Sequence, residues 1–226
     1  MIKHYYENVL ASQNITAKTN VVWVADITTL DLAEEKKMYV FLCIDIHTNF
    51  IVSALISKKI ITTQNITRKL EKSIKKRFSV NPVKRLIIHT DRGTQFSSQS
   101  YNTFTRKYEE YFIPSMAREN TPTDNAVAER FMRTFKQHKI YNITVEERLS
   151  TEIAINSRFN SYRACLNKYV KSLNNKPNKK SSFKGPEKHY KDVLTAKEHK
   201  ESRTALSRIE PAKKLFFDLL TALYKH

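Results

Sequence analysis

Three continuous apolar segments lie in the first quarter of the chain. They span Asn20–Leu30, Met38–Thr48 and Asn49–Ser57 and are rich in β-branched residues. Apolar runs of this length predict central strands that are buried on both faces. The tripeptide His-Thr-Asn between the second and third runs predicts a tight connection. Residues 1–18 are polar without a clear period, and we interpret them as a lead-in.

The hydrophobic period then changes to that of helices. Within Thr62–Phe78, apolar residues recur every fourth position, which predicts an amphipathic helix with Lys and Arg opposite and Pro82 beyond its end. The segment Phe112–Ala117 contains Pro114 and predicts an edge strand. The other predicted elements are a strand at Val83–Asp91, a helix at Ser97–Tyr111, a helix capped by Asp124, and a long helical stretch at Thr144–Leu173.

Three early strands followed by alternating helices and strands predict an α/β fold. We expect a mixed five-stranded sheet flanked by helices, antiparallel at first and parallel afterwards. We place the core domain at residues 19–175. Residues 176–226 are Lys-rich and form a basic C-terminal arm, and the apolar pattern of Ala212–Tyr224 is typical of a terminal helix.

Charge changes this picture most. The chain holds 40 Lys and Arg against 22 Asp and Glu, a formal net charge of +18, so nucleic acid is the expected partner and an anionic membrane surface the weaker alternative. No apolar run is long enough for a transmembrane helix, and the first residues lack the apolar region of a signal peptide. The two cysteines, Cys43 and Cys165, suggest no disulfide framework. We therefore expect a cytoplasmic or nucleoid-associated protein; an organellar origin stays open.

Glycine is scarce: only Gly93 and Gly185 occur in 226 residues. Average usage of about 7% would give roughly sixteen. A glycine retained in such a chain is expected to meet a requirement of the backbone.

Three carboxylates stand where local preferences disfavour them. Asp26 interrupts a β-branched run, Asp91 directly follows an apolar strand and precedes Gly93, and Glu129 lies early in a basic helix. Three oxygen donors on rigid elements can hold two Mg²⁺ or Mn²⁺ ions, which suits phosphodiester displacement. Taken singly, each has a simpler interpretation. Glu129 could form a salt bridge with Arg130 or Arg133, and Asp26 could cap a strand end. Asp45, in the second apolar run, remains a fourth candidate.

The motifs around these carboxylates resemble those of a known family. The segments NVVWVADIT, IIHTDRGTQFSS and MARENTPTDNAVAERFMRTFK together resemble the integrase-type catalytic core of DDE transposases from bacterial insertion sequences, which is related to retroviral integrases. The matching positions are Trp23, Asp26, Thr28, His89, Asp91, Gly93, Gln95, Phe96, Asp124, Asn125, Ala126 and Glu129.

This resemblance implies an RNase H-like fold with Asp26, Asp91 and Glu129 as catalytic, metal-binding residues. It implies hydrolysis at transposon DNA ends, transfer of the freed 3′-OH to target DNA, and a homo-oligomer assembled on paired ends. His89 and Gly93 would support the site without binding substrate. The residues expected to contact DNA are Gln95, Asn125, Arg130, Arg133, Lys136 and Lys139.

The chain also departs from the family pattern. The loop before Asp124 lacks the usual glycine, and no helix-turn-helix precedes the core, so a separate helix-turn-helix protein could recognise the ends. Two alternative functions stay open. One is a DNA-binding protein with an inactive site, such as a domesticated copy; the other is an RNase H-like nuclease that cuts but never joins.

Overall fold

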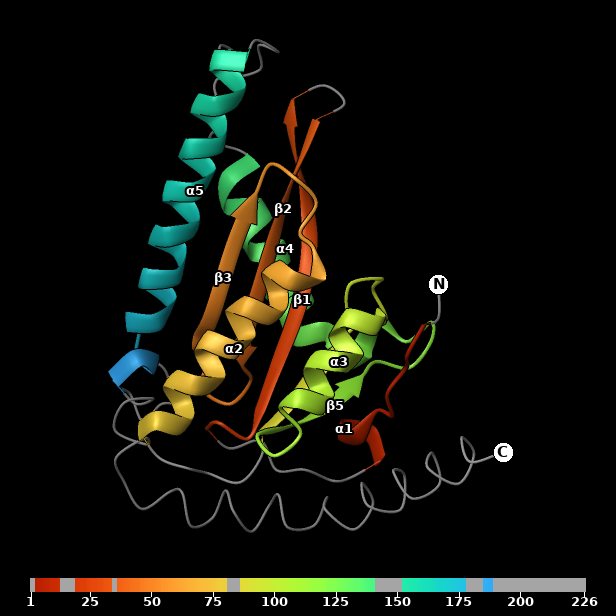
Figure 1. Cartoon of the computed structure of the whole chain (residues 1–226). Helices are drawn as coiled ribbons and strands as arrows, with labels where there is room; N and C mark the ends of the chain where they lie inside the picture. Colours follow the sequence, from red (N-terminus) through yellow and green to blue (C-terminus); the bar gives the residue numbers. More distant parts are fainter. Residues whose placement is uncertain are drawn as a thin grey trace.

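The computed structural model describes residues 3–12, 19–33, 36–80, 86–140, 152–177 and 185–188. Its centre is a five-stranded sheet in the order β3-β2-β1-β4-β5 (Figure 1). The strands are β1 Val22–Ala33, β2 Lys36–Asp45, β3 Ile51–Ser57, β4 Leu86–Thr90 and β5 Phe112–Met116. Strands β1, β2 and β3 pair antiparallel, whereas β4 pairs parallel with both β1 and β5. The predicted mixed sheet is confirmed.

The order of strands explains their composition. Strand β2 lies inside the sheet. Its first two residues are exposed lysines, and the residues that follow are buried except for half-buried Tyr39. Strand β5 lies at the edge of the sheet. Pro114 has no N–H to donate, and an edge strand tolerates this because no further strand pairs with its outer side. The edge position predicted from this proline is confirmed.

Helices cover both faces of the sheet. In Figure 1, α2 (Thr63–Val80) and α3 (Gln99–Lys107) lie in front, and α4 (Ala126–Ile140) lies behind. The long helix α5 (Glu152–Asn175) packs with α4 on that second face and runs beside β3. Two short helical segments complete the described part: α1 (Val9–Ser12) and the 3-10 turn η1 (Pro122–Asn125).

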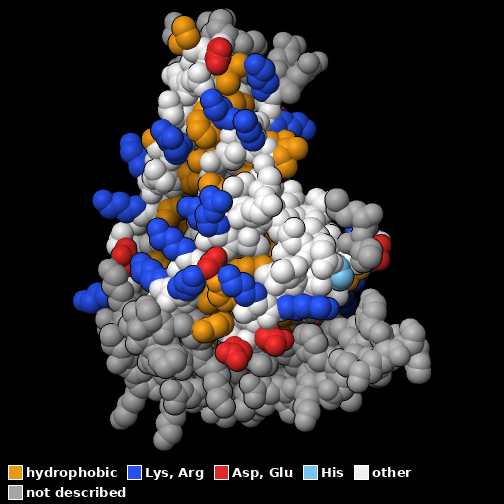
Figure 2. All heavy atoms as spheres, in the orientation of Figure 1, with side chains coloured by type: hydrophobic (Ala, Val, Ile, Leu, Met, Phe, Trp, Pro, Cys, Tyr) orange, Lys and Arg blue, Asp and Glu red, His pale blue; other side chains and the backbone are white. Residues whose placement is uncertain are grey.

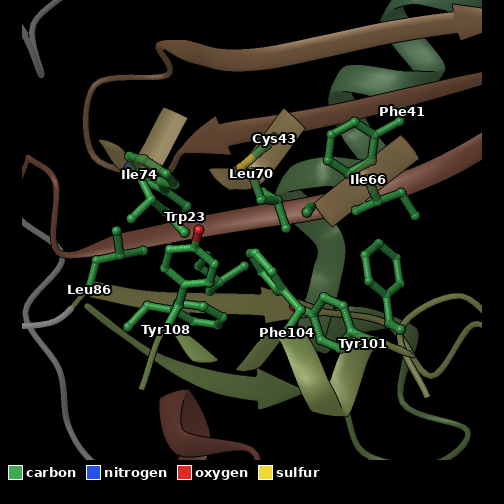
Figure 3. Packing of buried hydrophobic residues seen from close by; sticks show 14 of the residues in the cluster. Trp23, Phe41, Cys43, Ile66, Leu70, Ile74, Leu86, Tyr101, Phe104 and Tyr108 are labelled. Carbon is green, nitrogen blue, oxygen red and sulfur yellow. The ribbon is translucent and has the colours of Figure 1, made fainter. Parts of the chain in front are cut away.

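Alternation along β1 divides the core into two layers. Trp23 points towards α2 and α3, where it packs among Phe41, Leu70 and Phe104 (Figure 3). Its neighbour Val24 belongs to the opposite layer, which the apolar sides of α4 and α5 cover. The predicted stripe of α2 is buried at Ile66, Leu70 and Ile74, whereas the side chain of Phe78 lies outside the described part.

Asparagine occupies the turns where glycine is usual. Asn20, Asn49 and Asn120 have φ values of 64°, 62° and 52°, in the left-handed region. Asparagine tolerates this region better than most residues. Asn49 closes the predicted tight connection before β3, and Asn120 lies in the loop where the family pattern expects a glycine. The chain therefore makes these turns with few glycines.

The N-terminal segment lies against the core rather than apart from it. His4 N donates to Ser97 O (2.8 Å), Met116 N donates to Glu7 O (3.3 Å) and Val9 N donates to Ser115 Oγ (3.0 Å). The described part of the polar lead-in, residues 3–12, thus lies beside β5.

Several predictions fall outside the described residues. These are Pro82, the first part of the stretch that begins at Thr144, most of the arm at 176–226, and the terminal helix at Ala212–Tyr224. Within the part that is described, no helix is both long and apolar enough to span a membrane.

Candidate active site

Two of the predicted carboxylates emerge from neighbouring parallel strands. The register of β1 against β4 pairs Val24 with His89 and Ala25 with Thr90. Asp26 directly follows the last paired residue of β1, and Asp91 directly follows the last paired residue of β4. The two residues therefore lie at the same level along the two strands. Because side chains alternate, Asp26 shares its face with Val24, the face that α4 covers. The fold therefore brings these two carboxylates to one place.

Helix α4 brings the third carboxylate to the same face. Asn125, which directly precedes α4, is buried, and its Nδ2 donates to Ala25 O across 3.4 Å. This contact fixes the start of α4 beside Asp26. Glu129 follows Asn125 by four residues, about one helical turn, and therefore lies on the same side of the helix. The apolar side of α4 is buried at Ala128, Phe131 and Phe135.

The electrostatic surroundings of Asp26 include both other carboxylates. The pKa of Asp26 rises to about 7, chiefly because the group is withdrawn from water and secondly because the charge of Asp91 lies close. The charge of Glu129 raises this pKa as well, whereas the hydrogen bond from Ile27 N and the charge of Lys136 lower it. Burial also raises the pKa of Asp91.

The carboxylates do not form a closed ligand set. In the described ranges, no group of three or more His, Cys, Asp or Glu side chains is close enough to hold a metal ion. Glu129 is exposed, and within the described part of the chain it pairs with neither Arg130 nor Arg133.

Gly93 is needed because its backbone lies close to the Asp91 carboxylate. Its N–H donates to Asp91 Oδ1 across 3.0 Å, and an added Cβ would stand 3.0 Å from that same oxygen. Its φ is not positive. A side chain at this position would therefore push the Asp91 carboxylate away. Gly185, the other glycine, approaches the backbone of Asn175, where an added Cβ would lie 2.6 Å from the carbonyl oxygen.

A cleft of about 450 Å³ opens beside Asp91 and Glu129. Asp91, Asn125 and Glu129 line it, as do residues that sequence reasoning missed, among them Tyr5, Arg92 and Arg118. Tyr5 comes from the polar lead-in, where no periodic signal marks it. Arg92 and Arg118 stand among many basic residues, so their charge alone did not distinguish them.

The loop before α4 is held by an ion pair that corrects one prediction. Arg118 binds Asp124 through two guanidinium nitrogens, Nε to Oδ2 (3.0 Å) and Nη2 to Oδ1 (2.9 Å), and through its backbone N–H (2.9 Å). Asn8 Nδ2 also donates to Asp124 (2.7 Å). The hydrogen bond from the Arg118 side chain is the main cause that lowers the pKa of Asp124. Asp124 therefore does not cap α4; its carboxylate is taken up by these donors.

His89 and Asp45 are buried and bond to neighbouring protein groups. His89 is fully buried, and its Nδ1 lies 2.9 Å from Ser115 Oγ; burial lowers its pKa to about 4 although nearby Asp124 opposes this. Asp45 accepts hydrogen bonds from the backbone of Asn20, His47 and Thr48 and from the Thr48 hydroxyl. Asp45 thus holds the turn after β2; like Asp26, it is not among the residues that line the cleft.

The residues predicted to contact DNA fall into different environments. Gln95 is half-buried, with Nε2 donating to Ile61 O (3.4 Å) and Oε1 accepting from Thr94 (3.1 Å). Arg130 and Arg133 are exposed on α4, Lys136 is half-buried near Asp26, and the side chain of Lys139 lies outside the described part.

Basic side chains also prevail more widely. On the face shown in Figure 2, Lys and Arg far outnumber Asp and Glu among the charged side chains. This distribution agrees with the formal net charge of +18.

Comparison with known proteins places these features in context. Residues 16–122 match the family model of the integrase core domain. The transposase of insertion sequence element IS904 from Lactococcus lactis subsp. lactis is 30% identical over 134 residues, 57% of this chain and 48% of the relative. Residues 16–122 are therefore similar to the integrase core domain, and this part of the chain resembles the core of an integrase-type transposase. The family match includes Asp26 and Asp91 and ends before Glu129, and the chain spans about half the length of the curated relative.

Solved structures identify the fold of the chain. The catalytic core domain of BIV integrase covers 78% of this chain and 97% of its own, with a TM-score of 0.51 and 16% sequence identity. The HTLV-2 integrase catalytic core domain, solved in complex with magnesium, covers 70% and 87%, with a TM-score of 0.40 and 18% identity. The first of these likenesses, with the mixed sheet and its flanking helices, confirms the RNase H-like fold.

Proposed function

We propose that this chain is a DDE-type polynucleotidyl transferase. It hydrolyses a phosphodiester bond at the ends of a mobile DNA element and joins the freed 3′-OH to target DNA. Asp26, Asp91 and Glu129 hold two Mg²⁺ or Mn²⁺ ions in this proposal. Its main support is the position of Asp26 and Asp91 at one level of β1 and β4, together with the pKa of Asp26, which both other carboxylates raise.

The donor set fits hard divalent cations. All three side chains offer oxygen, which Mg²⁺ prefers, whereas zinc would favour His or Cys. Bound ions of this kind would stabilise the attacking and the leaving oxygen of the phosphodiester. Asp26 and Asp91 are fixed at the ends of paired strand segments, and Gly93 leaves room for the Asp91 carboxylate. Glu129 is exposed, and in this proposal rotation of its side chain would complete the set.

The surrounding residues position DNA. Arg130, Arg133, Lys136 and Lys139 belong to α4 and would contact phosphate groups next to the carboxylates. Gln95 would contact the scissile strand from the loop after β4. We assign Asn125 to positioning, because its amide is buried and bonds to Ala25 O. We also propose a homo-oligomer on paired ends, with a separate helix-turn-helix protein for their recognition.

The test is a reaction that needs no end recognition. A branched DNA that mimics the joined product is incubated with the full chain and Mn²⁺ or Mg²⁺, and release of the branch is measured as the reverse of joining. Asp91→Asn and Glu129→Gln are expected to abolish release. Asp31→Asn is the matched control, because Asp31 is an exposed carboxylate on the same strand as Asp26 and is not among the residues that line the cleft. Metal-dependent release that survives Asp91→Asn would refute the assignment.

The same assay separates the alternatives. A DNA-binding protein with an inactive site would bind the branched DNA in a salt-sensitive way, without reaction under either metal, and Asp91→Asn would leave binding unchanged. A nuclease would cleave the strands but neither release nor re-form the joined product. We expect both metal-dependent cleavage and rejoining.

A further inference from the structure

The first described residues alternate between two environments. His4 and Tyr6 face α3: the His4 ring bonds to Gln99, and the Tyr6 hydroxyl bonds to Asn102 (3.0 Å) and Thr105 (2.8 Å). Tyr5 lies between them and points the other way, as expected for an extended segment. Because both neighbours and the adjoining backbone are anchored, the position of Tyr5 is set by the core.

Tyr5 lies in the cleft that Asp91 and Glu129 line, and its surface is 46% exposed. Its ring faces Arg92, whose guanidinium carbon is 5.0 Å from the ring centroid. Arg92 is held in turn by Ala117 O (Nε, 3.0 Å) and by Glu119 (Nη1, 3.3 Å). A fixed, accessible aromatic ring with a fixed cation therefore stands next to the candidate carboxylates.

This arrangement has the chemistry of a stacking position for single-stranded nucleic acid. Accessible aromatic rings stack on bases, and arginines beside them contact the phosphates. A paired base inside a duplex has both faces covered by its neighbours, so only an unpaired base can stack on a protein ring. Arg92 and Arg118 supply positive charge in the same cleft.

We propose that Tyr5 stacks on an unpaired base next to the scissile phosphate, so that the N-terminal segment forms part of the DNA site. This inference rests on the proposed function, because it needs DNA to enter the cleft. The competing explanation is that Tyr5 only shields the guanidinium of Arg92. Shielding would affect duplex and single-stranded DNA alike, whereas stacking requires an unpaired base.

The experiment measures stacking without catalysis. The full chain carrying Asp91→Asn is titrated into a duplex with a short unpaired overhang that contains 2-aminopurine, whose fluorescence falls when it stacks. A blunt duplex of the same sequence, with 2-aminopurine paired, is the comparison DNA. The variants are Tyr5→Leu and Tyr5→Phe. The control is Tyr111→Leu, because Tyr111 is also exposed (38%) and lies against Tyr108, with ring centroids 5.9 Å apart.

Tyr5→Leu is expected to remove the fluorescence decrease and to weaken binding of the overhang about fivefold, the low end for base–aromatic stacking. Tyr5→Phe keeps the ring and should stay within about twofold of the parent protein. Tyr111→Leu should change neither signal, and the blunt duplex should bind all variants alike. Thermal unfolding of each variant confirms that it is folded.

Two results would overturn the inference. One is an equal loss for overhang and blunt duplex, which supports shielding of Arg92; the other is a fluorescence decrease that persists in Tyr5→Leu. Either leaves the proposed function standing if the branched-DNA reaction still requires Asp91. If that reaction is absent while Tyr5 still quenches the overhang, the proposed chemistry fails and the stacking site remains.

Discussion

Replacing Asp26 by Asn should stabilise the metal-free protein at pH 8. In the folded chain, burial and the charges of Asp91 and Glu129 raise the pKa of Asp26 from 3.8 to about 7. Between about pH 4 and pH 7 the folded protein keeps a proton that the unfolded chain has released. The free energy of unfolding therefore falls as pH rises through this range. Asn carries no charge, and its Oδ1 can still accept the hydrogen bond from Ile27 N.

The size of the effect follows from the pKa of Asp26. A difference of about three pH units, at about 1.4 kcal/mol each, gives about 4 kcal/mol as an upper limit. Asp26 retains some contact with water, so we expect about 1–3 kcal/mol at pH 8 and almost no difference near pH 4. Mg²⁺ should instead stabilise the wild type relative to Asp26→Asn. At ten times its dissociation constant it should add about 1.4 kcal/mol to the wild type and little to Asp26→Asn.

Urea unfolding followed by circular dichroism, between pH 4 and pH 8 with EDTA or with Mg²⁺, measures these differences. Asp31→Asn is the control, because Asp31 is exposed on the same strand. The pH dependence that Asp45 contributes is common to all three proteins and cancels. If Asp26→Asn is less stable than the wild type at pH 8 in EDTA, or differs from it equally at pH 4 and pH 8, the electrostatic account of the site is wrong.

Two further predictions concern the residues around this site. Gly93→Ala should slow DNA joining by about tenfold or more in the branched-DNA assay, because its Cβ would displace the Asp91 carboxylate, while thermal stability changes little; unchanged joining would contradict this. His89→Asn should remove a loss of stability between pH 6.5 and pH 4. Burial lowers the pKa of His89 to about 4, so only the unfolded chain binds the proton in that range and unfolding is favoured on acidification. Urea midpoints at pH 4.5 and pH 7.5 test it, and an unchanged pH dependence would exclude His89 as its source.

The strands and helices could be predicted because each has a strong local signal. Most of the apolar run that contains Cys43 is buried, and Pro114 lies on the edge strand as its missing N–H requires. Boundaries were less predictable. Strand β1 continues to Ala33 through Asp31, since pairing with β2 stabilises polar residues that local propensity disfavours. The packing of residues 3–12 gave no signal, because an extended polar segment is held by single hydrogen bonds to distant residues.

The site shows the same division between local and distant information. Asp26 and Asp91 could be singled out because a carboxylate in an apolar run or before a rare glycine conflicts with local preference, whereas Glu129 was assigned to the site through the resemblance of its motif to the transposase family. The groups that hold and surround them could not be found in this way. Asn125 bonds to Ala25, one hundred positions away in sequence, and Asn8 bonds to Asp124. Such contacts depend on how β1, η1 and the N-terminal segment meet, which no single stretch of sequence encodes.

Asp124 shows why a local rule can fail at such a place. As a short acidic residue just before a helix it fits the pattern of an N-cap, which stabilises a helix by about 1 kcal/mol. In the fold, three donors of Arg118 and the amide of Asn8 surround its carboxylate. A charge-assisted, two-point bond to arginine competes successfully with a single backbone N–H. Through these bonds, Asp124 connects the loop that carries Arg118 and the N-terminal segment that carries Asn8 to the start of α4. One carboxylate thus links three segments beside the cleft.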